Sequence, residues 1–209
     1  LKGKQSSLFF EIPRIVALFQ NLWLGKLYWF VENVFSMQTE HVEAFNASLG
    51  VKPYMICASD FSWVKRPRLY WTNRNLVTSV DASSVDRGLY IEVKVTVVKN
   101  APDSWVSPGW VWHGDGNCLP TFTKLSNWGV PHAIVAGLGS ASREAVCRWT
   151  DAQFVSQVYN FEERYMLTNS EGILRIPSAE EREILMGFDR YYTEGAFKED
   201  PESFDNNIV

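Results

Sequence analysis

Three charged side chains in the first third of the chain are of the types that acid–base chemistry requires. Glu32 follows a short apolar run, and Arg66 and Arg68 flank a proline just before another such run. A carboxylic acid in a closed, desolvated pocket has a raised pKa and can donate a proton or a hydrogen bond. A guanidinium keeps its own proton and can hold an oxygen on which negative charge builds. Glu32, Arg66 and Arg68 are therefore of the residue types that such chemistry needs.

Each of these signals is weak by itself. A Glu at a strand end is commonly a solvated turn residue, and two Arg at alternate positions commonly form a surface face or ordinary ion pairs. A third segment, Arg175 to Phe188, contains Ser178 and Glu181 at the spacing of a helix capping box. We expect a capped helix over Ser178–Gly187, with Glu180–Glu183 as its solvated face.

The elements that must position Glu32 and the two Arg follow from the hydrophobic pattern. Three short apolar runs have the length and composition of buried parallel strands: Leu27–Val34, Tyr54–Ala58 and Leu69–Thr72. Thr39–Leu49 has a helical pattern, and Gly50 is placed to end it. Strand, helix and strand at this spacing indicate βαβ units and an α/β sheet. Since groups at the carboxyl ends of such strands face a crevice, we expect Glu32 to point into it.

The remaining segments are less regular. Leu8–Gln20 predicts an amphipathic helix, with Ser6 or Ser7 as its cap and Pro13 as a kink. Leu89–Lys99 alternates with period two, which indicates a half-solvated strand outside the parallel core. Residues 100–132 are rich in Pro, Gly and Trp and predict an irregular subdomain. Four of its tryptophans either build a small core, which we favour, or form a stacking platform for bases: Trp105, Trp110, Trp112 and Trp128.

Five segments, taken in order, carry a family resemblance. They are Ser7–Arg14 (SLFFEIPR), Tyr28–Met37 (YWFVENVFSM), Pro53–Asn73 with its Arg-Pro-Arg, Thr121–Asn127 (TFTKLSN) and Arg175–Tyr192 (RIPSAEEREILMGFDRYY). Together they resemble the DNA cytosine-5 methyltransferases, and among these the animal de novo type most closely. The resemblance covers most of 7–73 and 165–192 and leaves the middle of the chain largely unmatched.

The resemblance implies a fold and a division of the chain. The fold is α/β, a partial Rossmann-like sheet of an S-adenosylmethionine-dependent methyltransferase, with an irregular, mixed target-recognition subdomain. Residues 1–80 would form the C-terminal part of the catalytic core, 81–172 the target-recognition region, and 173–209 a return to the core.

The resemblance also implies the chemistry. A thiolate adds to carbon 6 of a flipped-out cytosine, and carbon 5 then attacks the methyl group of S-adenosylmethionine. Glu32 matches the family's acid at ring nitrogen 3, Arg68 matches the Arg that contacts the base, and Arg66 would contact a phosphate or steady the pocket. Besides Arg66 and Arg68, candidate DNA-binding residues are Thr123, Lys124, Ser126 and Asn127. An ordinary polar loop is the alternative for these last four.

The family's nucleophilic Cys loop has no counterpart here, and we expect this fragment to be inactive alone. Cys57 lies in an apolar run, and Cys118 and Cys147 match no catalytic position. Most of the S-adenosylmethionine site is missing too, so no cofactor-binding residue is assigned. His132–Val146 contains glycines that imitate a cofactor loop, but we favour a Gly/Ser loop of the recognition region. The widely spaced Cys and His predict no metal site.

The composition of the chain limits the kinds of partner that we expect it to bind. The formal net charge of −4 argues against a protein that coats nucleic acid non-specifically, but permits a local basic DNA site. No run is long enough to span a membrane. We expect DNA as the partner, together with a homo-oligomer or a methyltransferase-like accessory subunit, in the nucleus if the source is eukaryotic and otherwise in the cytoplasm. Two alternatives stay open: a catalytically inactive DNA-binding or accessory module, and an RNA cytosine methyltransferase.

Overall fold

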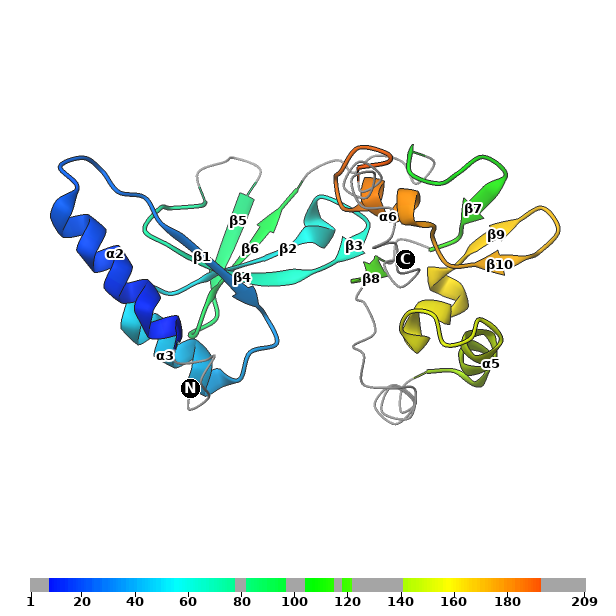
Figure 1. The fold of residues 1–209 in the computed structure, drawn as a ribbon, viewed down its shortest axis with the longest axis horizontal. Coiled ribbons are helices and arrows are strands. Elements are labelled where there is room, and N and C mark those ends of the chain that lie inside the picture. Colours follow the sequence, from blue (N-terminus) through cyan, green and yellow to red (C-terminus); the bar gives the residue numbers. More distant parts are fainter. Residues whose placement is uncertain (1–7, 78–81, 97–103, 115–117, 122–140, 193–209) are drawn as a thin grey trace, which may run out of the picture. The chain divides into compact units, whose positions relative to one another are not determined.

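The structure, a computed structural model, describes residues 8–77, 82–96, 104–114, 118–121 and 141–192 (Figure 1). The chain divides into two compact units. The first consists of Leu1–Phe61 and Pro67–Val98, and the second of Ser62–Arg66 and Lys99–Val209. Each unit is described by itself below.

A five-stranded mixed sheet forms the first unit. Its strands, in spatial order, are β1 (Phe30–Val34), β4 (Pro67–Thr72), β2 (Tyr54–Cys57), β6 (Ile91–Val95) and β5 (Ala82–Asp86). The β2–β6 pair is parallel, and the other neighbouring pairs are antiparallel. Two antiparallel steps therefore leave β1 and β2 parallel to each other, with β4 between them. The expected α/β class is correct at the level of a mixed sheet with helices.

Two strands differ from the sequence prediction. β1 is not a buried parallel strand: it lies at one edge, pairs antiparallel with β4, and its residues alternate between exposed and half-buried. Glu32 accordingly occupies the middle of β1 and not its carboxyl end. β6 lies inside the sheet as the parallel neighbour of β2, although its alternating pattern suggested a strand outside the parallel core. An alternating pattern shows that one face of a strand is more exposed than the other, but it does not show which strand lies next to it.

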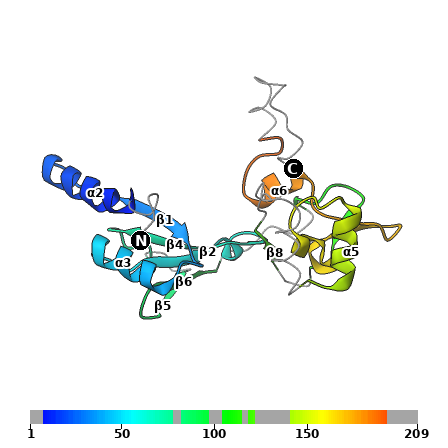
Figure 2. The same cartoon turned by 60° about the horizontal axis from the view of Figure 1, so that its bottom comes forward.

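Helices cover one face of this sheet (Figures 1 and 2). A 3-10 turn η1 (Leu8–Phe10) leads into α2 (Glu11–Leu22), α3 spans Thr39–Leu49, and a second turn η2 covers Ala58–Asp60. The apolar side chains buried between helices and sheet are Phe9, Val42, Phe45, Leu69 and Trp71. This cluster fixes the buried face of the sheet and leaves the opposite face for other contacts.

The predicted limits of α3 are correct. Gly50 follows the last helical residue with a left-handed φ of 70°, and its N–H donates to Asn46 O at 2.9 Å. α2 can contain Pro13 without the predicted kink, because Pro13 lies in the first helical turn. Backbone N–H groups in that turn have no intrahelical partner, so the missing N–H of proline costs no hydrogen bond. Ser6 and Ser7, the expected caps, lie outside the described residues.

The second unit is built from short elements. Strands β10 (Leu174–Arg175), β9 (Leu167–Asn169) and β7 (Trp110–Trp112) form an antiparallel sheet, and β3 (Val64–Lys65) pairs parallel with β8 (Leu119–Pro120). The helical elements are α5 (Arg143–Asp151), η4 (Val158–Phe161), η5 (Glu163–Tyr165) and α6 (Ala179–Leu185). The short, irregular elements agree with the expected character of this region.

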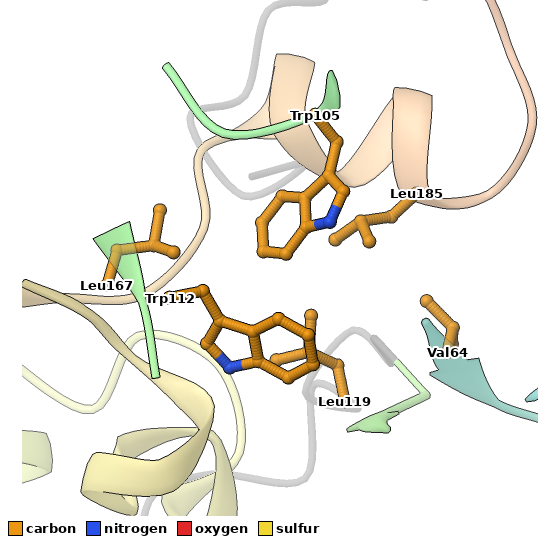
Figure 3. Packing of buried hydrophobic residues seen from close by; sticks show 6 residues of the cluster. All are labelled: Val64, Trp105, Trp112, Leu119, Leu167 and Leu185. Carbon is orange, nitrogen blue, oxygen red and sulfur yellow. The ribbon is translucent and has the colours of Figure 1, made fainter. Parts of the chain in front are cut away.

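Tryptophan supplies much of the core of the second unit. Figure 3 shows the buried cluster of Val64, Trp105, Trp112, Leu119, Leu167 and Leu185. Trp110 is half-buried beside it. For these tryptophans the core interpretation is therefore confirmed over the stacking platform, and Trp128 lies outside the described residues. A second cluster joins α5 to η4 through Trp149 and Phe161.

The two units join segments that are distant in sequence. The β5–β6 hairpin, residues 82–95, belongs to the sheet of the first unit. Residues 173–192 belong to the second unit, where Leu185 packs into its core. The predicted division into 1–80, 81–172 and 173–209 concerns functional regions and stays a prediction.

Candidate functional site

Glu32 and Arg68 form an ion pair on the face of the sheet opposite the helices. Strand pairing places Glu32 opposite Tyr70 and Arg68 opposite Val34, so the two charged side chains are diagonal neighbours on one face. Arg68 Nε lies 2.8 Å from Glu32 Oε1. The Arg68 side chain is 17% exposed and the Glu32 side chain 42%. The structure thus brings the carboxylate of Glu32 and the guanidinium of Arg68 together.

The guanidinium of Arg68 has a second anchor. Its Nη1 donates to the backbone oxygen of Pro67 at 3.0 Å. A guanidinium held through two of its edges presents its remaining N–H groups in a fixed plane. Such a group can hold an acceptor oxygen in a defined orientation.

An aromatic pair lies beside the ion pair. Phe30 and Tyr70 stack with ring centroids 5.1 Å apart and an interplanar angle of 26°. Both belong to the same face as Glu32, because Phe30 precedes Glu32 by two positions and Tyr70 lies opposite Glu32. Phe30 is exposed. The sequence analysis did not identify this pair, although the period-two spacing of Phe30 and Glu32 is a signal that could have found it.

Side chains beyond the end of the β1–β4 ladder hold this edge in place. The amide of Asn73 donates through Nδ2 to Leu27 O at 2.8 Å and accepts through Oδ1 from Trp29 N at 3.2 Å. The Thr72 hydroxyl donates to Trp29 O at 2.7 Å. These bonds extend the pairing of residues 27–29 with the end of β4, and so fix the register that brings Glu32 and Arg68 together.

The other predicted site residues are not part of this pair. Arg66 is exposed and belongs to the second unit. Thr123, Lys124, Ser126 and Asn127 lie outside the described residues. The site that the structure brings together therefore consists of Glu32, Arg68 and the neighbouring rings.

A second Glu–Arg pair lies in the second unit, within the segment Arg175 to Phe188. Two guanidinium nitrogens of Arg175 donate to Glu181, at 2.7 and 2.8 Å, and the backbone N–H groups of Ser178 and Ser107 donate to the same carboxylate at 2.7 and 2.9 Å. The Arg175 guanidinium also lies over the Trp110 ring, 4.2 Å from its centroid. The capping box between Ser178 and Glu181 is confirmed.

Burial of this carboxylate corrects one prediction. Glu181 and Glu183 are 0% and 4% exposed, so Glu180–Glu183 is not a solvated helix face. Burial by itself raises the pKa of Glu181, but the bonds from Arg175 and from the Ser178 and Ser107 amides outweigh it and lower the pKa to about 2. Through the hydrogen bonds that its oxygens accept, Glu181 links α6 to the loop before β7 and to β10. We assign it a structural role.

The residues that could hold a metal ion do not gather in the described part of the chain. Within that part no group of three or more His, Cys, Asp and Glu could hold a metal ion. The Cys57 thiol is half-buried and accepts a hydrogen bond from Ser59 Oγ at 2.9 Å. Most of the glycine-containing stretch after His132 lies outside the described residues. Its Ser142 caps α5 and binds Glu162, so the part described fits a helix cap and not a site for S-adenosylmethionine.

None of the helices in the described ranges is long and apolar enough to cross a membrane. No protein-family model matches the sequence, and no curated protein matches it significantly.

Proposed function

We propose that the Glu32–Arg68 face is the target-base side of a DNA cytosine-5 methyltransferase, as the family resemblance of the flanking segments implies. The observation that supports this most is the 2.8 Å contact between the two predicted residues, which are 36 positions apart. A surface pair of Glu and Arg also occurs without function. Here, however, Glu32 and Arg68 lie in two separate segments, and each segment resembles a family motif that contacts the ring of the target base.

Each residue has a defined task in this proposal. Arg68 holds the exocyclic oxygen at ring position 2, where negative charge builds during the reaction, and never gives up its own proton. Glu32 provides a proton or a hydrogen bond at ring nitrogen 3. S-adenosylmethionine supplies the methyl group in the family. Because the described residues do not form a site for it, we assign no step of this chain to that cofactor.

A second candidate function is that of an accessory module, which recruits or stabilises an active methyltransferase through helix contacts. The outer face of α2 favours it. Four apolar side chains at helical spacing are between 43% and 69% exposed: Ile15, Leu18, Phe19 and Leu22. The Glu32–Arg68 pair is the observation that favours the enzyme, since a module that only binds a partner has no need for it.

A methyl-transfer assay of the protein tests the first proposal. Glu32→Gln removes the acid while keeping the size of the side chain, and we expect the rate of methyl transfer to cytosine-containing DNA to fall by about two to three orders of magnitude. DNA affinity, measured by fluorescence anisotropy, is expected to survive. Unchanged turnover in this variant would remove Glu32 from the mechanism.

Two further variants make this test specific. Glu43→Gln changes an exposed carboxylate on α3 and leaves the pair alone, so its activity should equal that of the wild type. Leu18→Glu together with Phe19→Glu changes only the apolar face of α2. Under the accessory-module hypothesis these two substitutions abolish stimulation of an active methyltransferase, while Glu32→Gln has no effect on it.

A further inference from the structure

We infer that the face of β1 and β4 that bears Glu32 binds an unpaired, extended stretch of nucleic acid, with nucleotides at three successive positions along β1. The inference rests on the proposed function for the position at Glu32 and Arg68, where the target base would lie. It adds the two neighbouring positions, each of which is formed by a pair of side chains in contact: Phe30 with Tyr70, and Tyr28 with Arg74.

The three positions follow from the geometry of an extended chain. Alternate residues of a strand share one face, so Phe30 and Glu32 lie on the same side of the sheet, opposite the helices. Tyr28 precedes Phe30 by two residues, in the segment that Asn73 and Thr72 hold along the end of β4. Two residues of an antiparallel strand advance by about 6.8 Å. The three positions are therefore about 6.8 Å apart along one edge of the sheet.

Phe30 offers a ring on which a base can stack. Its ring packs on Tyr70 with centroids 5.1 Å apart, and Phe30 nevertheless remains 59% exposed. Because Tyr70 already restrains this ring, a base that packs on its exposed surface costs little further ordering of the side chain. Every base has an aromatic face, so such stacking tolerates any sequence. The nucleotide next to the target base can therefore be of any type.

Tyr28 and Arg74 combine a ring with a positive charge. The Arg74 guanidinium lies 4.2 Å from the centroid of the Tyr28 ring, Tyr28 is 53% exposed, and Arg74 is exposed too. In the described ranges no carboxylate pairs with Arg74. A guanidinium binds phosphate oxygens through two parallel N–H groups. This position can therefore hold the backbone of a nucleic acid as well as a base.

The spacing of the three positions favours an unpaired strand over a duplex. Successive bases along one strand of a duplex lie about 3.4 Å apart, and a stretched single strand separates them roughly twice as far. The separation of about 6.8 Å along β1 fits the stretched strand. Rings next to guanidinium groups are also the combination by which proteins bind single-stranded nucleic acids.

Fluorescence anisotropy with labelled oligonucleotides tests the inference on the whole protein. The probes are a short single-stranded DNA with one central cytosine, the RNA of the same sequence, and the fully paired DNA duplex. We expect at least one of the single strands to bind about tenfold or more tightly than the duplex. The comparison of the two single strands shows which sugar the face accepts.

Substitutions on this face should weaken the binding of the preferred single strand. Tyr28→Ala and Phe30→Ala should each weaken it by roughly 5- to 100-fold, because the stacking of one base is lost. Phe30→Trp retains a ring and should bind as the wild type does, whereas Phe30→Leu retains only an apolar side chain and should bind as weakly as Phe30→Ala. Arg74→Gln removes one phosphate contact and should reduce the slope of log affinity against log salt concentration by about 0.7.

Phe10→Ala is the matched control. Phe10 is 47% exposed, but it belongs to the helical layer on the other face of the sheet, so its loss should leave oligonucleotide affinity unchanged. Circular dichroism of each variant checks the fold. Failure of both single strands to bind overturns the inference, as does duplex binding that is equally tight. Wild-type affinity in Phe30→Leu overturns it too, since the face then acts as an apolar surface of the kind that a protein partner would cover.

The two proposals fail in distinguishable ways. Single-strand binding that depends on Tyr28 and Phe30, in a protein that transfers no methyl group, contradicts the proposed function alone. Methyl transfer that depends on Glu32 but proceeds at the wild-type rate in Tyr28→Ala and Phe30→Ala contradicts the inference alone.

Discussion

Glu32 and Glu181 are both paired with an arginine, and their surroundings give them different roles. Glu32 is partly exposed and has a guanidinium on one oxygen. Glu181 is fully buried and receives four hydrogen bonds, two from Arg175 and two from backbone amides. A carboxylate that is fully enclosed by donors is fixed in its ionised form, while one open to solvent can exchange its partner for a ligand.

The acid stability of the second unit should depend on Glu181. Its pKa falls from 4.5 to about 2 on folding, which corresponds to a stabilisation on the order of 3 kcal/mol. Because the folded-state pKa is the lower one, this stabilisation is complete above about pH 4.5 and is lost as the pH falls toward about 2. Urea unfolding of Glu181→Gln and the wild type should therefore differ most near neutral pH, and the difference should shrink in acid.

Glu180→Gln is the matched control for that measurement. Glu180 is the neighbouring residue, and its pair with Arg190 at 3.3 Å involves side chains that are about 40% exposed. Exposed pairs contribute about 0–1 kcal/mol. An equal effect of the two substitutions, or a Glu181→Gln effect that does not vary with pH, would contradict the role given to Glu181.

At the scale of elements, one amide side chain adds hydrogen bonds to the apolar packing of α3 on the sheet. Asn46 Oδ1 accepts from the indole N–H of Trp71 at 2.7 Å, and Asn46 Nδ2 donates to Leu89 O at 2.9 Å. Trp71 is 0% exposed, so its N–H has no access to water if Asn46 is lost. One residue of α3 therefore connects the helix to β4 and to the turn that precedes β6.

Removal of this amide should destabilise the first unit. We expect Asn46→Ala to lower the free energy of unfolding by about 2 kcal/mol, because it leaves a buried donor and a backbone acceptor without partners. Asn46→Asp retains an acceptor for Trp71 and should cost less. Asn21→Ala, at an exposed position of α2, is the control that should leave stability within about 0.5 kcal/mol of the wild type.

At the scale of the whole molecule, the chain has two compact units with separate cores. Phe45, Leu69 and Trp71 belong to the core of the first, and Trp105, Trp112 and Leu167 to the core of the second. Units with their own cores commonly unfold as separate cooperative blocks. Stability effects should therefore be confined to the unit in which a substitution lies.

Differential scanning calorimetry of the whole chain tests this separation. We expect two unfolding transitions, one lowered by Asn46→Ala and the other by Glu181→Gln. Each of these losses of a few kcal/mol should shift its own transition by roughly 10 °C. A single transition that both substitutions lower equally would show that the units unfold as one.

Local features were determined by the sequence. The limits of α3, with Gly50 as its stop, and the capping box of Ser178 and Glu181 follow from contacts between residues at most four positions apart. The positions of β2 and β4 also follow from short apolar runs. Such features are predictable because the residues that make them are adjacent in the chain.

The tertiary structure decided the rest, for one physical reason: strand pairing and burial depend on residues far apart in sequence. The pattern of Leu27–Val34 allows either direction of pairing, and the antiparallel β4 made β1 an edge strand with Glu32 on its open face. The sequence pattern predicted Glu181 as a surface residue, whereas in the folded chain Arg175 and the Ser107 amide enclose its carboxylate. The sequence by itself selected Glu32 and Arg68, and the register of β1 against β4 brought them within 2.8 Å.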